Sequence, residues 1–275
     1  MTDRKDYPET IDEKDLYEDI DEEEMYELIQ EERRKAFRQH KEEKKPKRPF
    51  PRWAFWLIAL FMVLSALSAL PKFLNLAAVD FLATSAKLSG NEEIQEYKQS
   101  VVTVRTENGK GTGFSISKDG YILTNNHVIE DGLRTWVNVP EQGQFSAEIV
   151  AAYPEIDLAL LKIDGKNIPY LTLGDDRHVQ PGDHIYFIGN PLAFTGIANE
   201  GEVLGYTESS LEGDVLMLKA PIYHGNSGSP VITESGKVVG VVYATRRSSE
   251  HGKVGLAVPI SYFLETEEGR DFDPE

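Results

Sequence analysis

One serine, one histidine and one aspartate in this chain could together hydrolyse an acyl bond. Ser227 lies within Gly225-Asn226-Ser227-Gly228-Ser229-Pro230, a turn of small residues. A serine hydroxyl is a weak nucleophile, so it needs an imidazole that takes its proton and a carboxylate that orients this imidazole. The glycines would allow a substrate carbonyl to approach main-chain N–H groups. The same residue types are also typical of a turn with no chemical role.

His127 and Asp157 are the candidate base and carboxylate. His127 follows the stretch YILTNN, where a strand end would hold its ring toward a cleft, and Asp157 stands at the entrance of the apolar stretch LALLKI. An aspartate that merely begins a strand would look the same. The other histidines stand in polar, turn or tail contexts: His40, His178, His184, His224 and His251. The order His, Asp, Ser favours catalysis, since chymotrypsin-type triads have it whereas α/β-hydrolases and subtilisins do not.

Short strands must position these residues. β-Branched and apolar runs bounded by turn signals predict strands at 101–104, 113–116, 121–124, 136–139, 145–150 and 158–163, and again at 184–188, 201–205, 215–218, 231–232, 238–243 and 254–258. Helical periodicity is weak over this part of the chain. Two groups of strands, separated near residues 165–182, predict an all-β fold of two β-barrels, at about 97–166 and 182–262 within a domain spanning 97–275.

The residues before this domain differ sharply in composition. Residues 1–32 carry fifteen acidic and three basic side chains, and residues 33–52 carry ten basic and two acidic ones. We expect residues 1–52 to form a charged cytoplasmic tail, largely disordered or partly helical. The eighteen residues 53–70 carry no charge, which predicts a membrane-spanning helix at 53–71, with the basic residues on the cytoplasmic side. Residues 72–96 are predicted to be a connector, and the domain after them to be extracytoplasmic.

Residues 100–262 resemble the protease domain of the HtrA (Deg) family of trypsin-fold serine proteases. Seven segments carry the resemblance, in the family's order: GKGTGFSI at 109–116, GYILTNNHVI at 120–129, DLALLKI at 157–163, GDHIYFIGNPLAFTG at 182–196, GNSGSPVI at 225–232, GKVVGVV at 236–242 and GLAVPI at 255–260. The resemblance implies a chymotrypsin/trypsin-like double β-barrel. It also implies an endopeptidase that acts on unfolded or surface polypeptides in protein quality control.

The resemblance further implies a role for each site residue. His127 is the general base, Asp157 orients it and Ser227 attacks. The N–H groups of Gly225 and Ser227 form the oxyanion hole, and Asn226 shapes the turn between them. Ile222 and Val242 lie near the primary substrate pocket, and because neither is acidic, we expect a preference for small or medium apolar residues rather than Lys or Arg.

Three features depart from the family pattern. Ser229 replaces a second glycine, as in glutamyl endopeptidases of this fold, and His224 stands where a small residue or proline is more usual. His224 would line the substrate cleft or adjust the oxyanion loop, or be a surface turn residue. Only 48 residues follow Ser227, so no PDZ domain is expected. Peptide-triggered activation through such a domain is then not implied, and the trimer common among relatives is in doubt.

Composition narrows the function classes. The net charge of −17 argues against nucleic acid as a partner. No cysteine is present, so disulfides and thiolate chemistry are excluded. Histidine and carboxylate residues show no metal spacing, and the glycine-rich stretch at 109–113 has no following helix for a nucleotide phosphate. We therefore predict a membrane-anchored serine endopeptidase without cofactor or metal. The alternative is a catalytically silent protein that uses the protease fold for binding or sensing.

Overall fold

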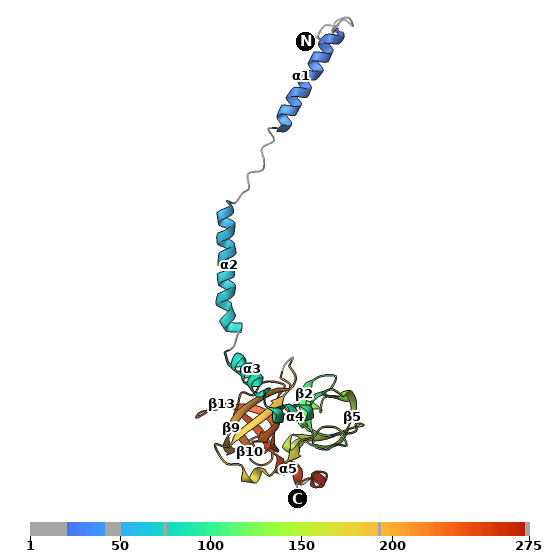
Figure 1. The fold of residues 1–275 in the computed structure, drawn as a ribbon, viewed down its shortest axis with the longest axis vertical. Coiled ribbons are helices and arrows are strands. Elements are labelled where there is room, and N and C mark those ends of the chain that lie inside the picture. Colours follow the sequence, from blue (N-terminus) through green and yellow to red (C-terminus); the bar gives the residue numbers. More distant parts are fainter. Residues whose placement is uncertain (1–20, 42–50, 74–75, 192–193, 273–275) are drawn as a thin grey trace, which may run out of the picture. The chain divides into compact units, whose positions relative to one another are not determined.

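The computed structural model describes residues 21–41, 51–73, 76–191 and 194–272 (Figure 1). The chain divides into two compact units, residues 1–69 and 70–275. Much of the predicted charged tail, residues 1–20 and 42–50, lies outside the described residues.

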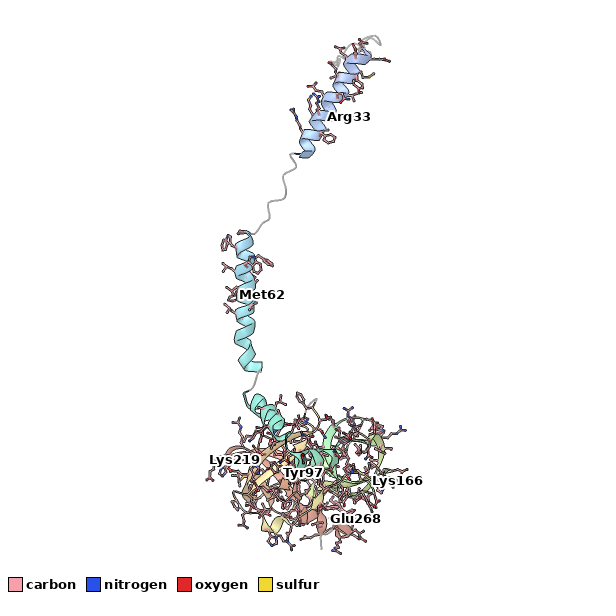
Figure 2. All side chains as sticks on the ribbon, in the orientation of Figure 1. Arg33, Met62, Tyr97, Lys166, Lys219 and Glu268 are labelled. Carbon is pink, nitrogen blue, oxygen red and sulfur yellow. The ribbon has the colours of Figure 1, made fainter. Side chains whose placement is uncertain are left out.

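The described residues of the first unit form helices. Helix α1 spans Glu22–Lys41 and begins with three glutamates, whose charge suits the positive end of a helix dipole. Helix α2 spans Arg52–Phe73, and exposed apolar side chains such as Met62 project from it (Figure 2). Among the residues that the structure describes, no helix is both long enough and apolar enough to cross a membrane. The span predicted at 53–71 is therefore not confirmed, and the side chains of residues 66–71 lie outside the described part.

Six antiparallel strands close the first barrel in the order β1-β2-β3-β6-β5-β4. Their bounds are β1 Val101–Arg105, β2 Lys110–Ser115, β3 Tyr121–Thr124, β4 Thr135–Val139, β5 Gly143–Tyr153 and β6 Leu158–Ile163. Alternate β-branched and aliphatic side chains, among them Val102, Val137 and Leu161, fill its interior. Each predicted strand of this group is present within a few residues of its expected position.

A second group of strands follows, in the sheet order β11-β8-β9-β10-β13-β12-β7. Their bounds are β7 Thr172–Leu173, β8 His184–Gly189, β9 Ile197–Thr207, β10 Val215–Lys219, β11 Pro230–Thr233, β12 Lys237–Ser248 and β13 Gly252–Pro259. Pairing of β11 with β12 closes six of them into a second barrel. The prediction of an all-β double barrel is confirmed, although the two-residue β7 was missed because so short a strand has no readable pattern.

A third apolar cluster joins the two barrels. It contains Phe114 and Leu160 from the first barrel and Ile232 and Val258 from the second. Helix α5, Ile260–Leu264, and the short helix η5, Gly269–Phe272, extend this cluster. The ring of Phe272 packs edge-on against Tyr121 at a centroid distance of 5.2 Å. The chain after the last strand therefore braces both barrels.

The connector predicted at 72–96 is more than a linker. Helix α3, Leu76–Leu88, and helix α4, Glu92–Ser100, occupy most of it and lead directly into β1. Asn91 caps α4 by accepting a hydrogen bond from the Glu93 N–H at 2.9 Å. Phe81 is buried in the core of the second barrel, and Ile94 is buried between the barrels. The sequence interpretation underestimated this segment because its polar stretch SGNEE was taken for a loop rather than for a helix cap.

We expect Phe81→Ala to lower the free energy of unfolding by about 3 kcal/mol, because it removes a large buried side chain from a packed core. Phe81 is 6% exposed, and its ring meets Tyr223 at a centroid distance of 4.8 Å. Urea titration followed by circular dichroism measures the change. The matched control is Leu82→Ala, since Leu82 is the next residue of α3 and is 39% exposed. A loss no larger than that of the control would show that α3 is only loosely docked.

Candidate functional site

His127 and Asp157 form a hydrogen-bonded pair at the edge of the first barrel. Nδ1 of His127 lies 2.7 Å from Oδ2 of Asp157, and the His127 main-chain N–H donates to Oδ1 over 2.9 Å. The Asp157 side chain is 11% exposed and that of His127 is 40% exposed. The carboxylate thus fixes the ring and the backbone of the histidine together, while the other ring nitrogen stays available to a reacting group.

Two short 3-10 turns bring this pair together. His127 lies in η2, Asn126–Val128, just after β3, so a short turn beyond the strand end holds its ring. Asp157 ends η3, Pro154–Ile156, with φ +52°, a left-handed conformation that aspartate tolerates better than most residues. The buried Asn125 amide donates to the Asp157 carbonyl over 2.8 Å. This bond ties the two turns together and was not predicted.

Ser227 follows a tight β-turn. The Asn226 N–H donates to the Tyr223 carbonyl over 3.1 Å, and Gly225 has φ +94°. A positive φ at the third residue is typical of a type II turn and strongly favours glycine. The N–H groups of Gly225 and Ser227 donate to no acceptor within the described residues. Two main-chain donors of the serine loop thus remain open, and an oxyanion is stabilised by donors of this kind.

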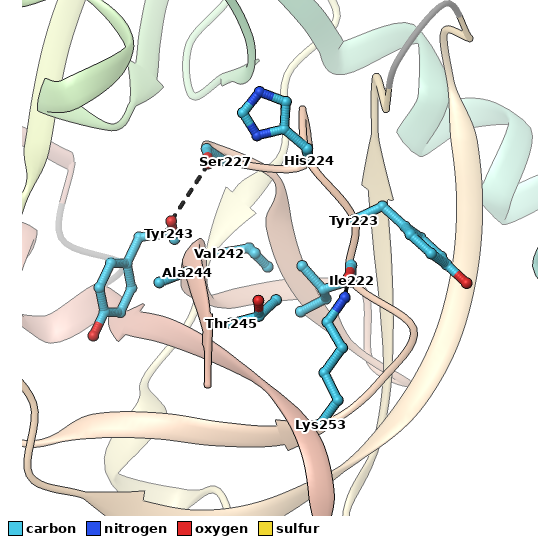
Figure 3. Close-up of a pocket in the computed structure, with 9 residues that line it drawn as sticks. All are labelled: Ile222, Tyr223, His224, Ser227, Val242, Tyr243, Ala244, Thr245 and Lys253. Carbon is cyan, nitrogen blue, oxygen red and sulfur yellow. Dashed lines mark hydrogen bonds between the residues drawn. The ribbon is translucent and has the colours of Figure 1, made fainter. Parts of the chain in front are cut away.

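The Ser227 hydroxyl donates to the Tyr243 carbonyl over 3.4 Å (Figure 3). In the described part of the chain it makes no hydrogen bond to the His127 ring. Both side chains line one cleft, which has a volume of about 250 Å³ and is bounded by Thr106, Asn108, Gly109, Lys110, His127, Val128, Asp131, His224, Gly225 and Ser227. Serine and histidine therefore face the same space, with the hydroxyl rotated toward the second barrel.

Thr112 joins the first barrel to the serine loop, which the sequence did not indicate. Its hydroxyl donates to the Gly225 carbonyl over 2.8 Å, and its N–H donates to the Ser227 carbonyl over 2.8 Å. Thr124 donates to the Thr112 carbonyl over 2.6 Å. A threonine between two glycines inside a strand was the available signal, because each glycine lets another segment approach closely.

A second cavity of about 320 Å³ opens beside Ser227 (Figure 3). It is lined by Ile222, Tyr223, His224, Ser227, Val242, Tyr243, Ala244, Thr245 and Lys253. The three residues predicted to lie near a substrate pocket, Ile222, Val242 and His224, are all among them. Thr245 and Lys253 were not predicted, because only the pairing of β12 with β13 brings them to this place.

His224 and Ser229, the two residues that depart from the family pattern, have different surroundings. His224 is exposed at the mouths of both cavities. Ser229 is fully buried beside Asn226, and the Ser229 hydroxyl and the Asn226 amide have no hydrogen-bond partner in the described part of the chain. A Cβ on Gly189 would lie 2.3 Å from the Ser229 hydroxyl oxygen. Glycine at 189 therefore gives these two polar side chains their space behind the nucleophile. Within the described residues, no group of three His, Cys, Asp or Glu side chains could hold a metal ion.

We expect the His127 ring to titrate above its ordinary pKa of about 6.5. The hydrogen bond that the His127 ring donates to Asp157 raises the pKa of His127 most, burial opposes this rise, and the charges of Asp157 and Glu130 add to it. Protonated His127 thus stabilises the fold. This contribution is complete below the ordinary pKa and is lost as the pH rises through the raised value. NMR titration of the ring measures the pKa, with Asp157→Asn as the comparison. A His127 pKa below 6.5, or one that Asp157→Asn leaves unchanged, would contradict the assignment.

This chain is similar to known proteases in sequence and in fold. Residues 111–241 match the family described as "Trypsin-like peptidase domain". The chain is 36% identical over 155 residues to a "Probable periplasmic serine endoprotease DegP-like" of Chlamydia muridarum. The alignment covers 54% of this chain and 31% of the relative. It is 37% identical over 161 residues to the protein of the same name in Pseudomonas fluorescens, covering 56% and 33% of the two chains. The chain thus spans about a third of the length of these curated relatives.

Among solved structures, the HtrA-type protease AlgW with a tripeptide superposes with a TM-score of 0.59 at 30% sequence identity. The superposition covers 64% of this chain and 61% of AlgW. These similarities support the interpretation of the domain as an HtrA-like, trypsin-fold serine protease.

Proposed function

We propose that this chain is a serine endopeptidase of HtrA type that cleaves polypeptides through an acyl-enzyme. The observation that carries the proposal is the His127–Asp157 pair, with 2.7 Å between Nδ1 and Oδ2, in the cleft that Ser227 also lines. The open N–H groups of Gly225 and Ser227 supply what the pair lacks, namely donors for a developing oxyanion.

Each group has a defined part in the reaction. Ser227 Oγ attacks a peptide carbonyl while His127 Nε2 takes the hydroxyl proton, and the carbonyl oxygen becomes an oxyanion held by the two N–H groups. His127 then gives the proton to the leaving amine, and the C–N bond breaks. Water, deprotonated by the same ring, releases the acid and restores Ser227. Asp157 stabilises the imidazolium without taking up its proton.

The reaction requires the Ser227 hydroxyl to change its hydrogen-bond partner. The Ser227 hydroxyl must leave the Tyr243 carbonyl, 3.4 Å away, and turn toward His127. A hydrogen bond of that length is weak, so the rotation costs little. Hydrogen bonds between catalytic groups are commonly long in unliganded enzymes and tighten when substrate binds.

The second candidate is a catalytically silent protein that uses the pockets only for binding. The specific observation that favours it is the bond from Ser227 to Tyr243 in place of one to His127. In that case the loop would hold polypeptides without cutting them.

Degradation of an unfolded protein distinguishes the two candidates. We expect the full chain to cleave a reduced and alkylated polypeptide at internal bonds. We expect Ser227→Ala to bind the same substrate without cleaving it. Mass spectrometry of the fragments identifies the bonds. Binding without cleavage by both proteins, over a range of pH and in the presence of peptides, would favour the silent protein.

Residues 53–71 are proposed as an anchor that places the protease domain outside the cytoplasm. The support is the eighteen-residue run without charge and the basic residues before it, together with the word "periplasmic" in the names of the relatives. Carbonate extraction of membranes tests the anchor, with Leu60→Lys plus Leu64→Lys as the disrupted variant. Release of the unaltered chain into the soluble fraction would overturn it. Trimeric assembly stays a prediction from the resemblance.

A further inference from the structure

Lys253 brings a positive charge to the cavity beside Ser227. Its Nζ donates to the Ile222 carbonyl over 2.8 Å and lies 5.1 Å from the centroid of the Tyr223 ring. Figure 3 shows the lysine stem running along the wall of the cavity toward Ile222. An ammonium group has three N–H donors, and the Ile222 carbonyl accepts one. The two others have no acceptor within the described residues.

No carboxylate of the described residues balances this charge. No Asp or Glu side chain lines the cavity, and no acidic oxygen lies within 4.0 Å of the ammonium in the described part of the chain. This is unusual in a chain with a net charge of −17. Lys253, which has no carboxylate partner in the described residues, is therefore positioned to bind a negatively charged group of a ligand beside Ser227.

A second cation stands beside the first. Arg247 of β12 is paired with Lys253 of β13 in the strand register, so the two side chains share one face of the sheet. Like charges directly opposite each other destabilise a strand pair. An anion bound beside the two cations would relieve this repulsion.

The rest of the cavity contains a further hydrogen-bond donor, and little space is left for an apolar side chain. The Thr245 hydroxyl has no partner in the described residues. Ile222 is 3% exposed and fills the space over Gly255, where an added Cβ would lie 2.1 Å from its Cδ1. An apolar substrate side chain would therefore find the bottom of the cavity filled by Ile222 and one side of it charged by Lys253.

We propose that this cavity selects an acidic side chain, Glu or Asp, at the substrate residue whose carbonyl Ser227 attacks, with Lys253 as the specificity-determining residue. The inference rests on the proposed peptidase function and names its substrate class. It replaces the apolar preference expected from Ile222 and Val242, because that expectation was formed without Lys253 and Thr245. The substrate carboxylate accepts hydrogen bonds from the Lys253 ammonium and the Thr245 hydroxyl.

Binding to full-length Ser227→Ala tests the proposal without requiring turnover. Fluorescent peptides that end in Glu, Gln or Val, and are otherwise identical, are compared by anisotropy. We expect the Glu peptide to bind about tenfold more tightly than its uncharged isostere Gln, since a charge-assisted hydrogen bond contributes about that factor. The difference should shrink as salt is raised, because the site is open to solvent.

Substitutions assign the preference to Lys253. In the same background, Lys253→Met keeps the stem and should abolish the preference for Glu over Gln, while Lys253→Glu should reverse it and Lys253→Arg should retain it. Lys219→Met is the matched control, since Lys219 is an exposed lysine of β10, paired with Glu202 and outside the cavity. Tighter binding of the Val peptide, or an acidic preference that survives Lys253→Met, would overturn the inference. If the protein is catalytically silent, Ser227→Ala would still show the preference for Glu, while the unaltered chain would leave the reduced and alkylated polypeptide uncut, so the two failures remain distinguishable.

Discussion

Asp157→Asn should lower kcat for peptide hydrolysis by about 10⁴-fold while leaving the fold intact, since the same change in another Ser-His-Asp triad has that effect. The asparagine carbonyl can still accept the His127 main-chain N–H, which Asp157 Oδ1 accepts at 2.9 Å. Its NH₂ group, however, replaces the oxygen that lies 2.7 Å from Nδ1. The ring must then carry its proton on Nε2, where it cannot take a proton from Ser227.

Steady-state kinetics with a fluorogenic peptide measures the loss, and circular dichroism checks the fold. Asp119→Asn is the control, because Asp119 is exposed and its side chain makes no hydrogen bond in the described residues. A loss of less than tenfold for Asp157→Asn would mean that the histidine does not depend on this carboxylate.

Gly228→Ala should disrupt both the fold and the nucleophile loop, lowering the free energy of unfolding by about 3 kcal/mol or more. An added Cβ would lie 1.8 Å from the Thr112 carbonyl oxygen and 2.7 Å from the Thr124 hydroxyl oxygen. Neither can move away easily, because they are hydrogen-bonded to each other at 2.6 Å. Gly228 also has φ +85°, which an alanine adopts only with strain.

Gly143→Ala separates the cost of the steric contact from the cost of the positive φ. Gly143 has φ +92°, and an added Cβ there meets nothing within 4 Å. This variant should lose only about 1 kcal/mol, the cost of the backbone angle alone. Urea titration of both variants measures the difference, and equal losses would contradict a close contact between the serine loop and the first barrel.

The strands were predictable because their signal is local. β-Branched runs such as Val101–Arg105 and the apolar run Leu158–Ile163 alternate or continue as buried strands do, and turn residues separate them. Helices α3 and α4 were missed, since their apolar residues become informative only once the barrels that bury Phe81 and Ile94 are known.

The candidate site was predictable as far as residue type and order carry information. Ser227, His127 and Asp157 could be chosen by their order, Ile222 and Val242 by resemblance, and His224 by its departure from the family pattern three residues before Ser227. Thr112 and Lys253 could not, because their roles depend on contacts with residues distant in sequence, Gly225 in one case and Ile222 in the other. Sequence periodicity reports the face of a strand and says nothing about which loop will cover that face.

Covalent labelling by a fluorophosphonate probe tests most directly whether Ser227 is a nucleophile activated by His127. We predict that intact-mass analysis and peptide mapping find one adduct, on Ser227, and that the rate of labelling falls as His127 becomes protonated at low pH. Ser227→Ala should take up no probe, and Asp157→Asn should react far more slowly. Absence of an adduct on Ser227 in the full chain, over a range of pH and with peptide present, would contradict the account.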